Sequence, residues 1–315
     1  MMTAAVSHQD RAFVHEAFFY RSPHEFDSGL VAFIRAGIEA GEPTFVVLSA
    51  EKIERLRAAL GESADDVIFA NMAEVGANPA RIIAAWQEFV VEHGAGGQPI
   101  RGIGEPIWAG RSDPELVECH RHESLLNLAF ADTPAFRLLC PYDVSALAED
   151  VVAEARRTHP YLSDVDSMNA SESYLGLDAI SAPFAEPLAD PPASADELAF
   201  DGDSLLDVRA LVAERAFAAN VARANSLVLS VNEIATNSVR HGGGQGVLRV
   251  WEDGEALICQ VEDRGRIEEP LVGRQRPVQD QPDGRGLWIA NQLCDLVQVR
   301  TFQNGSAVRV HMARN

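Results

Sequence analysis

Lysine is almost absent from this chain of 315 residues, because Lys52 is the only one and the other 25 basic residues are arginines. A Walker phosphate-binding loop needs a glycine directly before its lysine, whereas Lys52 follows Glu51. The sequence therefore excludes a Walker-type nucleotide site. Any cation that contacts a phosphate in the second half of the chain must be an arginine.

Cysteine is also scarce. The pattern of four cysteines without a CxxC pair, each in an apolar or helical context, predicts buried free thiols in a reducing compartment and argues against a metal site. The N-terminus has no apolar core of signal-peptide length, and no uncharged apolar run approaches about 18 residues. We therefore expect a soluble, cytoplasmic protein without a membrane span. The cysteines are Cys119, Cys140, Cys259 and Cys294.

Positive charge is in short supply, since the net charge is −21. A chain this acidic repels phosphates, which argues against general binding to nucleic acid or to an anionic membrane. The charge is uneven: residues 195–315 hold 13 arginines and 17 acidic residues, a balance of −4, which leaves −17 for residues 1–194. We therefore expect an acidic ligand to bind the second part of the chain more favourably than the first.

Short apolar segments alternate with amphipathic helical segments over residues 12–160. This alternation predicts βαβ units, and hence an α/β domain with a mostly parallel sheet covered by helices on both faces. The segments that we expect to form strands are 17–20, 43–50, 67–72, 100–104 and 136–143.

The composition changes after this domain and becomes rich in proline, alanine and aspartate. We therefore expect an extended linker over residues 161–196. Residues 197–315 then show helical segments, a hairpin over 246–263, a further helix and a final hairpin that turns around Asn304-Gly305. This order predicts an α+β two-layer sandwich, with helices against an antiparallel sheet.

One helical segment of the second domain carries a row of polar residues. Glu233, Asn237 and His241 recur at every fourth position, and three glycines follow. Residues four apart lie on one face of a helix, and the neighbouring face here is mostly apolar. The pattern is compatible with a solvated helix edge that stops at glycine, and equally with a row that lines a cavity.

Two further clusters follow along the chain. Asp263 ends a strand-like segment and is followed by Gly265, while Gly284 and Gly286 precede a helix. A buried aspartate can accept a hydrogen bond from an adenine amino group, and glycine amides before a helix can hold phosphate. An asparagine at a cavity edge can ligate a divalent cation, and a glutamate one turn away can act as a general base. Together, the three clusters favour a nucleotide site.

In this order and spacing, "NEIATNSVRHG", "VEDRG" and "GRGL" resemble the N box and the two glycine boxes of the GHKL ATPase superfamily. That superfamily includes histidine kinases, gyrase-type ATPases and bacterial anti-sigma serine kinases. The resemblance implies ATP and Mg²⁺ as cofactors, with Asn237 as the Mg²⁺ ligand, Glu233 as the catalytic base and Asp263 as the residue that recognises adenine. The other residues that it places along the nucleotide are His241, Gly265, Gly284, Arg285 and Gly286.

Short loops and a terminal hairpin look most like the anti-sigma kinase branch of this superfamily. Two features depart from the pattern: Ile267 stands where many relatives have another glycine, and the lid over residues 264–282 contains no lysine. Arg274, Arg276 and Arg285 can supply positive charge there. Both departures bear on phosphoryl transfer more than on nucleotide binding.

In the first domain, "HEAFFYRSPHEFDSGLVAFIRAGIEAGE", "GEPIW" and "LLCPYD" resemble the MEDS domain, a sensory module named from methanogens and methylotrophs. The resemblance covers residues 12–160 and implies an unidentified small ligand. Relatives often carry a cysteine near the first strand, where this chain has Ala17 and Phe18. Open α/β sheets bind ligands at strand ends. The residues that we expect to face the ligand are His15, Tyr20, Glu105, Trp108, Glu123 and Asp143.

Together, the resemblances imply a signal-responsive regulator that phosphorylates a serine or threonine of a STAS-type anti-sigma antagonist and so controls a sigma factor. One alternative is a nucleotide-binding module that holds its partner without kinase activity. Another is an atypical sensor histidine kinase, for which "HRHESLLN" at residues 120–127 offers a His-Glu pair, although this segment lies inside the first domain. The oligomeric state stays open, a homodimer included.

Overall fold

The computed structural model describes residues 12–176, 178–180, 186–277 and 284–315. The chain divides into two compact units, Met1–Ile180 and Ser181–Asn315. Within the described ranges, the helices are too short or too polar to cross a membrane.

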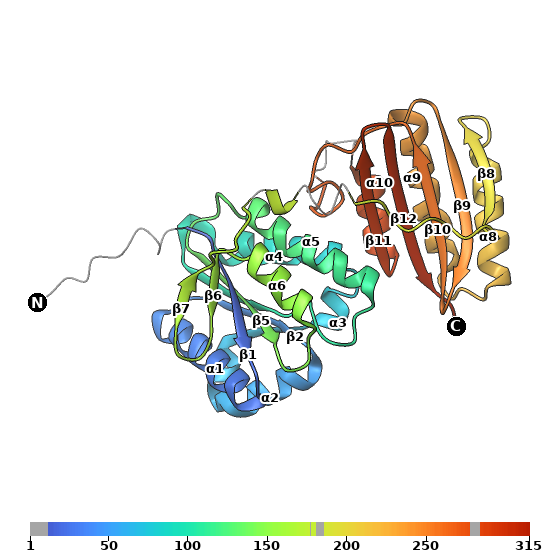
Figure 1. Ribbon diagram of the computed structural model, residues 1–315. Coiled ribbons are helices and arrows are strands. Elements are labelled where there is room, and N and C mark those ends of the chain that lie inside the picture. Colours follow the sequence, from blue (N-terminus) through green and yellow to red (C-terminus); the bar gives the residue numbers. More distant parts are fainter. Residues whose placement is uncertain (1–11, 177, 181–185, 278–283) are drawn as a thin grey trace, which may run out of the picture. The chain divides into compact units, whose positions relative to one another are not determined.

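The first unit is built on a seven-stranded sheet in the order β3-β2-β4-β5-β1-β6-β7 (Figure 1). Neighbouring strands from β3 to β6 are parallel, and β7 runs antiparallel to β6. The expected mostly parallel sheet is therefore confirmed. The strands are β1 (Val14–Tyr20), β2 (Thr44–Leu48), β3 (Val67–Asn71), β4 (Ile100–Gly104), β5 (Phe136–Asp143), β6 (Tyr161–Ser163) and β7 (Met168–Ala170).

Helices cover both faces of this sheet (Figure 1). On one face, α1 and α2 share an apolar core with alternate residues of the strands, among them Phe18 and Leu139. On the other face, Trp86 of α4 packs edge-on against Phe45 of β2, with the ring centroids 5.1 Å apart. The helices are α1 (Pro23–Ala40), α2 (Ala50–Leu60), α3 (Met72–Val75), α4 (Ile82–His93), α5 (Asp113–Ala129) and α6 (Glu149–Thr158).

The linker expected over residues 161–196 is shorter in the structure. Tyr161 lies opposite Glu16 in the parallel pairing of β6 with β1, and β7 returns antiparallel to β6. Residues 161–170 are therefore part of the first sheet, because strand pairing fixes this segment in spite of its polar composition. Part of the remaining stretch, residues 181–185, lies outside the described residues.

The second unit has a five-stranded sheet in the order β11-β12-β10-β9-β8, in which each neighbouring pair is antiparallel. Three helices pack on one face of this sheet around an apolar core, and the expected two-layer sandwich is confirmed. The elements are β8 (Asp196–Asp201), α8 (Leu205–Ala218), α9 (Ala224–His241), β9 (Gln245–Asp253), β10 (Ala256–Asp263), α10 (Arg285–Leu293), β11 (Leu296–Phe302) and β12 (Gly305–Ala313).

The opposite face of the second sheet is polar and hydrogen-bonded. Arg309 Nε donates to Gln260 Oε1 at 2.6 Å, and its guanidinium lies 5.0 Å from the ring centroid of Trp251. The apolar core of this unit therefore lies on the helix side of the sheet.

The final hairpin turns through residues 303–304, and Phe302 pairs with Gly305.

Candidate functional site

The row of polar residues on α9 lies at the edge of the buried face of this helix. Leu227, Val231, Ile234, Ala235 and Ser238 are buried against the sheet, as the periodicity predicts. Glu233 and Asn237 are half-buried, and His241 is exposed at the end of the helix. The polar row therefore lies beside the core, where it can border a cavity.

A cavity of about 290 Å³ opens between α9, the end of β10 and the start of α10. Its polar wall includes Asn237, Asp263 and the backbone around Gly265 and Gly284, and its apolar wall includes Ile267. A concave site with apolar walls and a few placed polar groups is the usual form of a small-molecule site. The other apolar residues of the wall are Ile234, Val272, Leu287 and Val308.

The Asp263 carboxylate is held in place by three hydrogen bonds. Ser238 Oγ donates to Oδ2 at 2.6 Å, while the Gly265 amide and Ser306 Oγ donate to Oδ1 at 2.8 and 3.0 Å. Ser238 comes from α9 and Ser306 comes from β12, where it pairs directly opposite Asp263. The carboxylate is thus a fixed acceptor at the cavity wall, with its orientation set by three different segments.

Glycine is needed where the chain passes behind this carboxylate. A Cβ on Gly242 would lie 2.4 Å from Asp263 Cγ, and one on Gly265 would lie 2.6 Å from the His241 carbonyl oxygen. Neither distance is tolerable for a real side chain. These two glycines let the end of α9 and the loop after β10 close around Asp263.

The start of α10 approaches α9 closely. Gly284 precedes the helix at φ +86°, a conformation that favours glycine. A Cβ on Gly286 would lie 2.8 Å from Asn237 Nδ2 and 3.3 Å from Glu233 Cβ. Gly286 therefore brings the amino end of α10 against the polar row of α9, where its amides and its dipole favour an anion.

The structure places the eight residues named for the nucleotide site in one region. Those that line the cavity are Asn237, His241, Asp263, Gly265 and Gly284. Gly286 packs against the side chains of Asn237 and Glu233, and Arg285 is exposed at the start of α10. Part of the expected lid, residues 278–282, lies outside the described residues.

Sequence reasoning missed the two serines that orient Asp263. Ser238 sits within the apolar face of α9, and a lone hydroxyl in such a face was a usable signal for a buried partner. Ser306 carried no signal, because its role depends on the register of β10 with β12.

Three of the residues named for the sensor site lie at the carboxyl ends of strands. Tyr20 ends β1, Glu105 follows β4, and Asp143 ends β5 opposite Tyr20. Lys52 joins two of them: its Nζ lies 2.6 Å from Glu105 Oε1 and 2.9 Å from the Tyr20 hydroxyl. Burial raises the pKa of Glu105, and Lys52 opposes that shift. This cluster, Tyr20-Lys52-Glu105, places paired charges at the strand ends.

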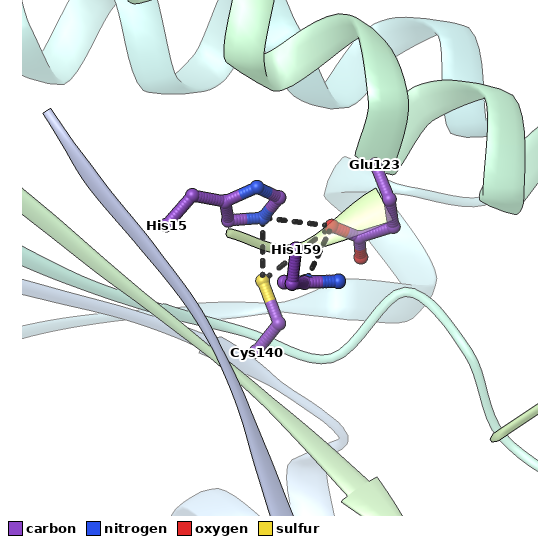
Figure 2. A group of neighbouring side chains, drawn as sticks. All are labelled: His15, Glu123, Cys140 and His159. Carbon is purple, nitrogen blue, oxygen red and sulfur yellow. Dashed lines mark hydrogen bonds and ion pairs between the residues drawn. The ribbon is translucent and has the colours of Figure 1, made fainter. Parts of the chain in front are cut away.

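Two others of the six lie elsewhere and belong together. His15 Nε2 lies 3.1 Å from Glu123 Oε2 in the interior of the unit, beside Cys140 and His159, which were not expected there (Figure 2). Burial and the nearby His159 lower the pKa of His15 to about 4, and burial raises that of Cys140. The sixth residue, Trp108, is stacked 3.9 Å beneath the Arg111 guanidinium.

The histidines of "HRHESLLN" do not have the setting of a phosphoacceptor. They lie on α5, which packs against α4 and α6 within the first unit. His122 is 1% exposed, and His120 is partly buried. A phosphoacceptor must reach a nucleotide held by another domain, so this placement weighs against the histidine-kinase alternative.

Two family models match the chain, one in each of its two units. Residues 14–160 match the family model described as MEDS, the MEthanogen/methylotroph, DcmR Sensory domain, and residues 202–312 match that of the histidine kinase-like ATPase domain. No curated protein matches the chain. Among solved structures, the Acinetobacter baumannii histidine kinase AdeS is 12% identical, with a TM-score of 0.23, over 38% of this chain and 68% of that chain. The chain therefore joins a MEDS domain to a histidine kinase-like ATPase domain.

Proposed function

We propose that the second unit binds ATP in the cavity between α9, β10 and α10. The observation that carries the proposal is the Asp263 carboxylate, which three donors hold as a fixed acceptor beside an apolar wall. In this proposal the adenine ring lies against the apolar wall, which includes Ile267 and Val308, and its amino group donates to Asp263. Phosphates then extend toward the amino end of α10, where backbone amides can receive them.

A magnesium ion completes this proposal. Asn237 lies at the cavity wall next to the amino end of α10, and its side-chain amide carries one oxygen that can ligate a cation. Mg²⁺ binds through few protein oxygens together with phosphate and water oxygens, so one asparagine ligand suffices. For Glu233, one turn earlier on α9, we propose the role of the base that accepts a proton from an attacking hydroxyl.

The reaction that we propose is transfer of the γ-phosphate to a serine or threonine of a STAS-type anti-sigma antagonist, which controls a sigma factor. The support is the resemblance of the three motifs to the GHKL superfamily and of the short loops and terminal hairpin to its anti-sigma kinase branch, together with the placement of the α5 histidines inside the first unit. The second candidate is a nucleotide-binding module that holds its partner without transferring phosphate. Ile267 in the cavity wall favours it, because a bulky side chain stands where many relatives have glycine.

Asn237→Ala should weaken Mg-ATP binding by about 10-fold or more, equivalent to about 1.4 kcal/mol, since it removes the protein oxygen that ligates Mg²⁺. Binding of ATP in the presence of a chelator should change much less. Isothermal titration calorimetry on the full chain measures both values.

The matched control is Asn232→Ala, because Asn232 lies on the same helix about 140° away around its axis. That variant should bind Mg-ATP like the wild type. A folded wild-type chain that shows no heat of binding with Mg-ATP would refute the nucleotide site, and equal losses in the two variants would refute the role of Asn237.

We also propose that a small ligand bound by the first unit regulates the second. The MEDS match supports this role, and the strand-end cluster Tyr20-Lys52-Glu105 offers charged groups to such a ligand. Regulation requires that the ligand binds the two output states with different affinity.

Removal of residues 1–180 tests this sensory role, because these residues form a separate compact unit. Partner capture by the remaining chain should persist but should no longer respond to growth conditions. The measurement is the amount of partner that co-purifies from cells across those conditions. Unchanged regulation in the truncated protein would contradict a sensory role for the first unit.

A further inference from the structure

Four buried side chains from distant parts of the chain meet inside the first unit (Figure 2). His15 lies on β1, Glu123 on α5 and Cys140 on β5, and His159 follows directly after α6. Each is at most 2% exposed. We call this group the His-Glu-Cys-His cluster. It joins two central strands to two helices of one face of the sheet.

Four distances within the cluster are close to those of a tetrahedral metal site. Glu123 Oε2 lies 3.1 Å from His15 Nε2, 3.3 Å from His159 Nε2 and 3.5 Å from Cys140 Sγ. Cys140 Sγ lies 3.4 Å from His15 Nε2. A tetrahedral zinc ion with bonds of about 2.0–2.3 Å holds its ligand atoms about 3.3–3.8 Å apart. Four of the six ligand-ligand distances are thus close to those of such a tetrahedron, and all four ligand atoms lie within 4.8 Å of one another.

Outer hydrogen bonds fix which nitrogen of each ring faces the cluster. Asn127 Nδ2 donates to the Thr158 carbonyl oxygen at 2.8 Å, which turns Asn127 Oδ1 toward His15 Nδ1 at 3.1 Å. His159 Nδ1 lies 2.8 Å from the Ala155 carbonyl oxygen. Both rings can thus donate a proton from Nδ1, which leaves the Nε2 lone pairs directed at Glu123. This outer support is typical of histidines that ligate a metal.

Without a cation, this arrangement brings acceptors against one another. With the proton on Nδ1, His15 Nε2 and the Glu123 carboxylate are both acceptors at 3.1 Å. His159 Nε2 makes no hydrogen bond of acceptable geometry among the described residues. Burial of lone pairs that point at one another without a hydrogen-bond donor is unfavourable. A metal ion bound between them removes the repulsion, because each lone pair then ligates the ion.

We propose that the His-Glu-Cys-His cluster binds one divalent transition-metal ion of the zinc class. Two imidazoles, a thiolate and a carboxylate are ligands that zinc accepts in tetrahedral sites. Hard ions such as Mg²⁺ and Ca²⁺ prefer all-oxygen sites. Ion binding displaces the thiol proton of Cys140 to solvent. Because all four positions come from buried protein groups, the ion ties α5 and the end of α6 to strands β1 and β5.

The absence of a CxxC pair among the four cysteines argues against a metal site. That argument depends on sequence spacing alone. Residues 15, 123, 140 and 159 form no short motif, and only the pairing of β1 with β5 brings the first and third onto one sheet face. A buried hydrogen-bonded network without an ion is the competing explanation, with a protonated histidine between the acceptors.

The test begins with the full chain, untagged and purified without chelator. Mass spectrometry of metals should find about one zinc ion per chain. Replacement by Co²⁺ should give intense visible bands and a thiolate-to-metal charge-transfer band in the near ultraviolet. In Cys140→Ser, the charge-transfer band should vanish and zinc affinity should fall by more than about 100-fold, since loss of an outer partner alone costs about 10–100-fold.

Cys119→Ser is the matched control, because Cys119 is equally buried on α5 and its Sγ contacts the Pro106 carbonyl oxygen at 3.3 Å. It should keep the wild-type metal content and spectrum. A folded wild-type chain that binds neither Zn²⁺ nor Co²⁺ would overturn the proposal. So would a charge-transfer band that survives in Cys140→Ser, or zinc affinity that survives in His159→Gln. If Cys140→Ser does not fold, the wild-type spectrum alone decides.

Discussion

Glu233→Gln should leave ATP bound and slow phosphoryl transfer by about 10²–10⁴-fold, the usual contribution of a general base. Glutamine keeps the size of the side chain and its contact with α10, where Gly286 lies against Glu233 Cβ. It removes the group that accepts the proton of the attacking hydroxyl. The loss should therefore appear in the rate of transfer and not in nucleotide affinity.

The measurement uses labelled ATP and a STAS-domain partner under single-turnover conditions, with ATP affinity measured in parallel. Glu214→Gln is the control, since Glu214 is exposed on α8 and should have no effect. Label on the partner with the wild type but equal rates in Glu233→Gln would exclude Glu233 as the base. Tight partner binding with no label from the wild type would leave the non-transferring module as the function.

Asp263→Asn should reduce ATP affinity by about 10- to 100-fold, because a hydrogen bond to a charged acceptor contributes about 1.5–3 kcal/mol. The amide can still accept from Gly265 and Ser306 at one oxygen, so we expect the fold to persist. Its other position becomes an N–H donor, which cannot accept from the adenine amino group. Discrimination between ATP and GTP should fall together with affinity.

Titration of the full chain with ATP and GTP measures this change. Asp253→Asn is the matched control, because Asp253 is an exposed aspartate at the far end of the same hairpin. It should bind both nucleotides like the wild type. Unchanged ATP affinity in a folded Asp263→Asn protein would show that the carboxylate does not contact the base.

Much of the candidate nucleotide site could be predicted from local sequence patterns. The spacing of Glu233, Asn237 and His241 predicts a single helix face, and α9 shows it beside a buried stripe. Asp263 was recognisable as the polar end of an alternating strand. Contacts that depend on strand register, such as the one from Ser306, could not be read, because pairing partners are set by the whole sheet.

In the first unit, even more of the contacts depend on the complete fold and could not be predicted from the sequence. The alternation of strands and helices predicts its fold, and His15 and Glu123 were expected to face a ligand. Their common partners Cys140 and His159 were not, since the four positions are spread over more than 140 residues. The short polar strands β6 and β7 were assigned to a linker, because three-residue strands carry too few residues for a periodic signal.

The ion pair of Lys52 with Glu105 limits how the partners of this protein can be found. Lys52 carries the only side-chain amine in the chain, and its side chain is 25% exposed. Amine-reactive crosslinkers and labels thus have a single side-chain target, already engaged by a carboxylate and a phenol. Such reagents find no side-chain amine on the second unit, whereas carboxylate-directed or photoactivated crosslinkers can attach there.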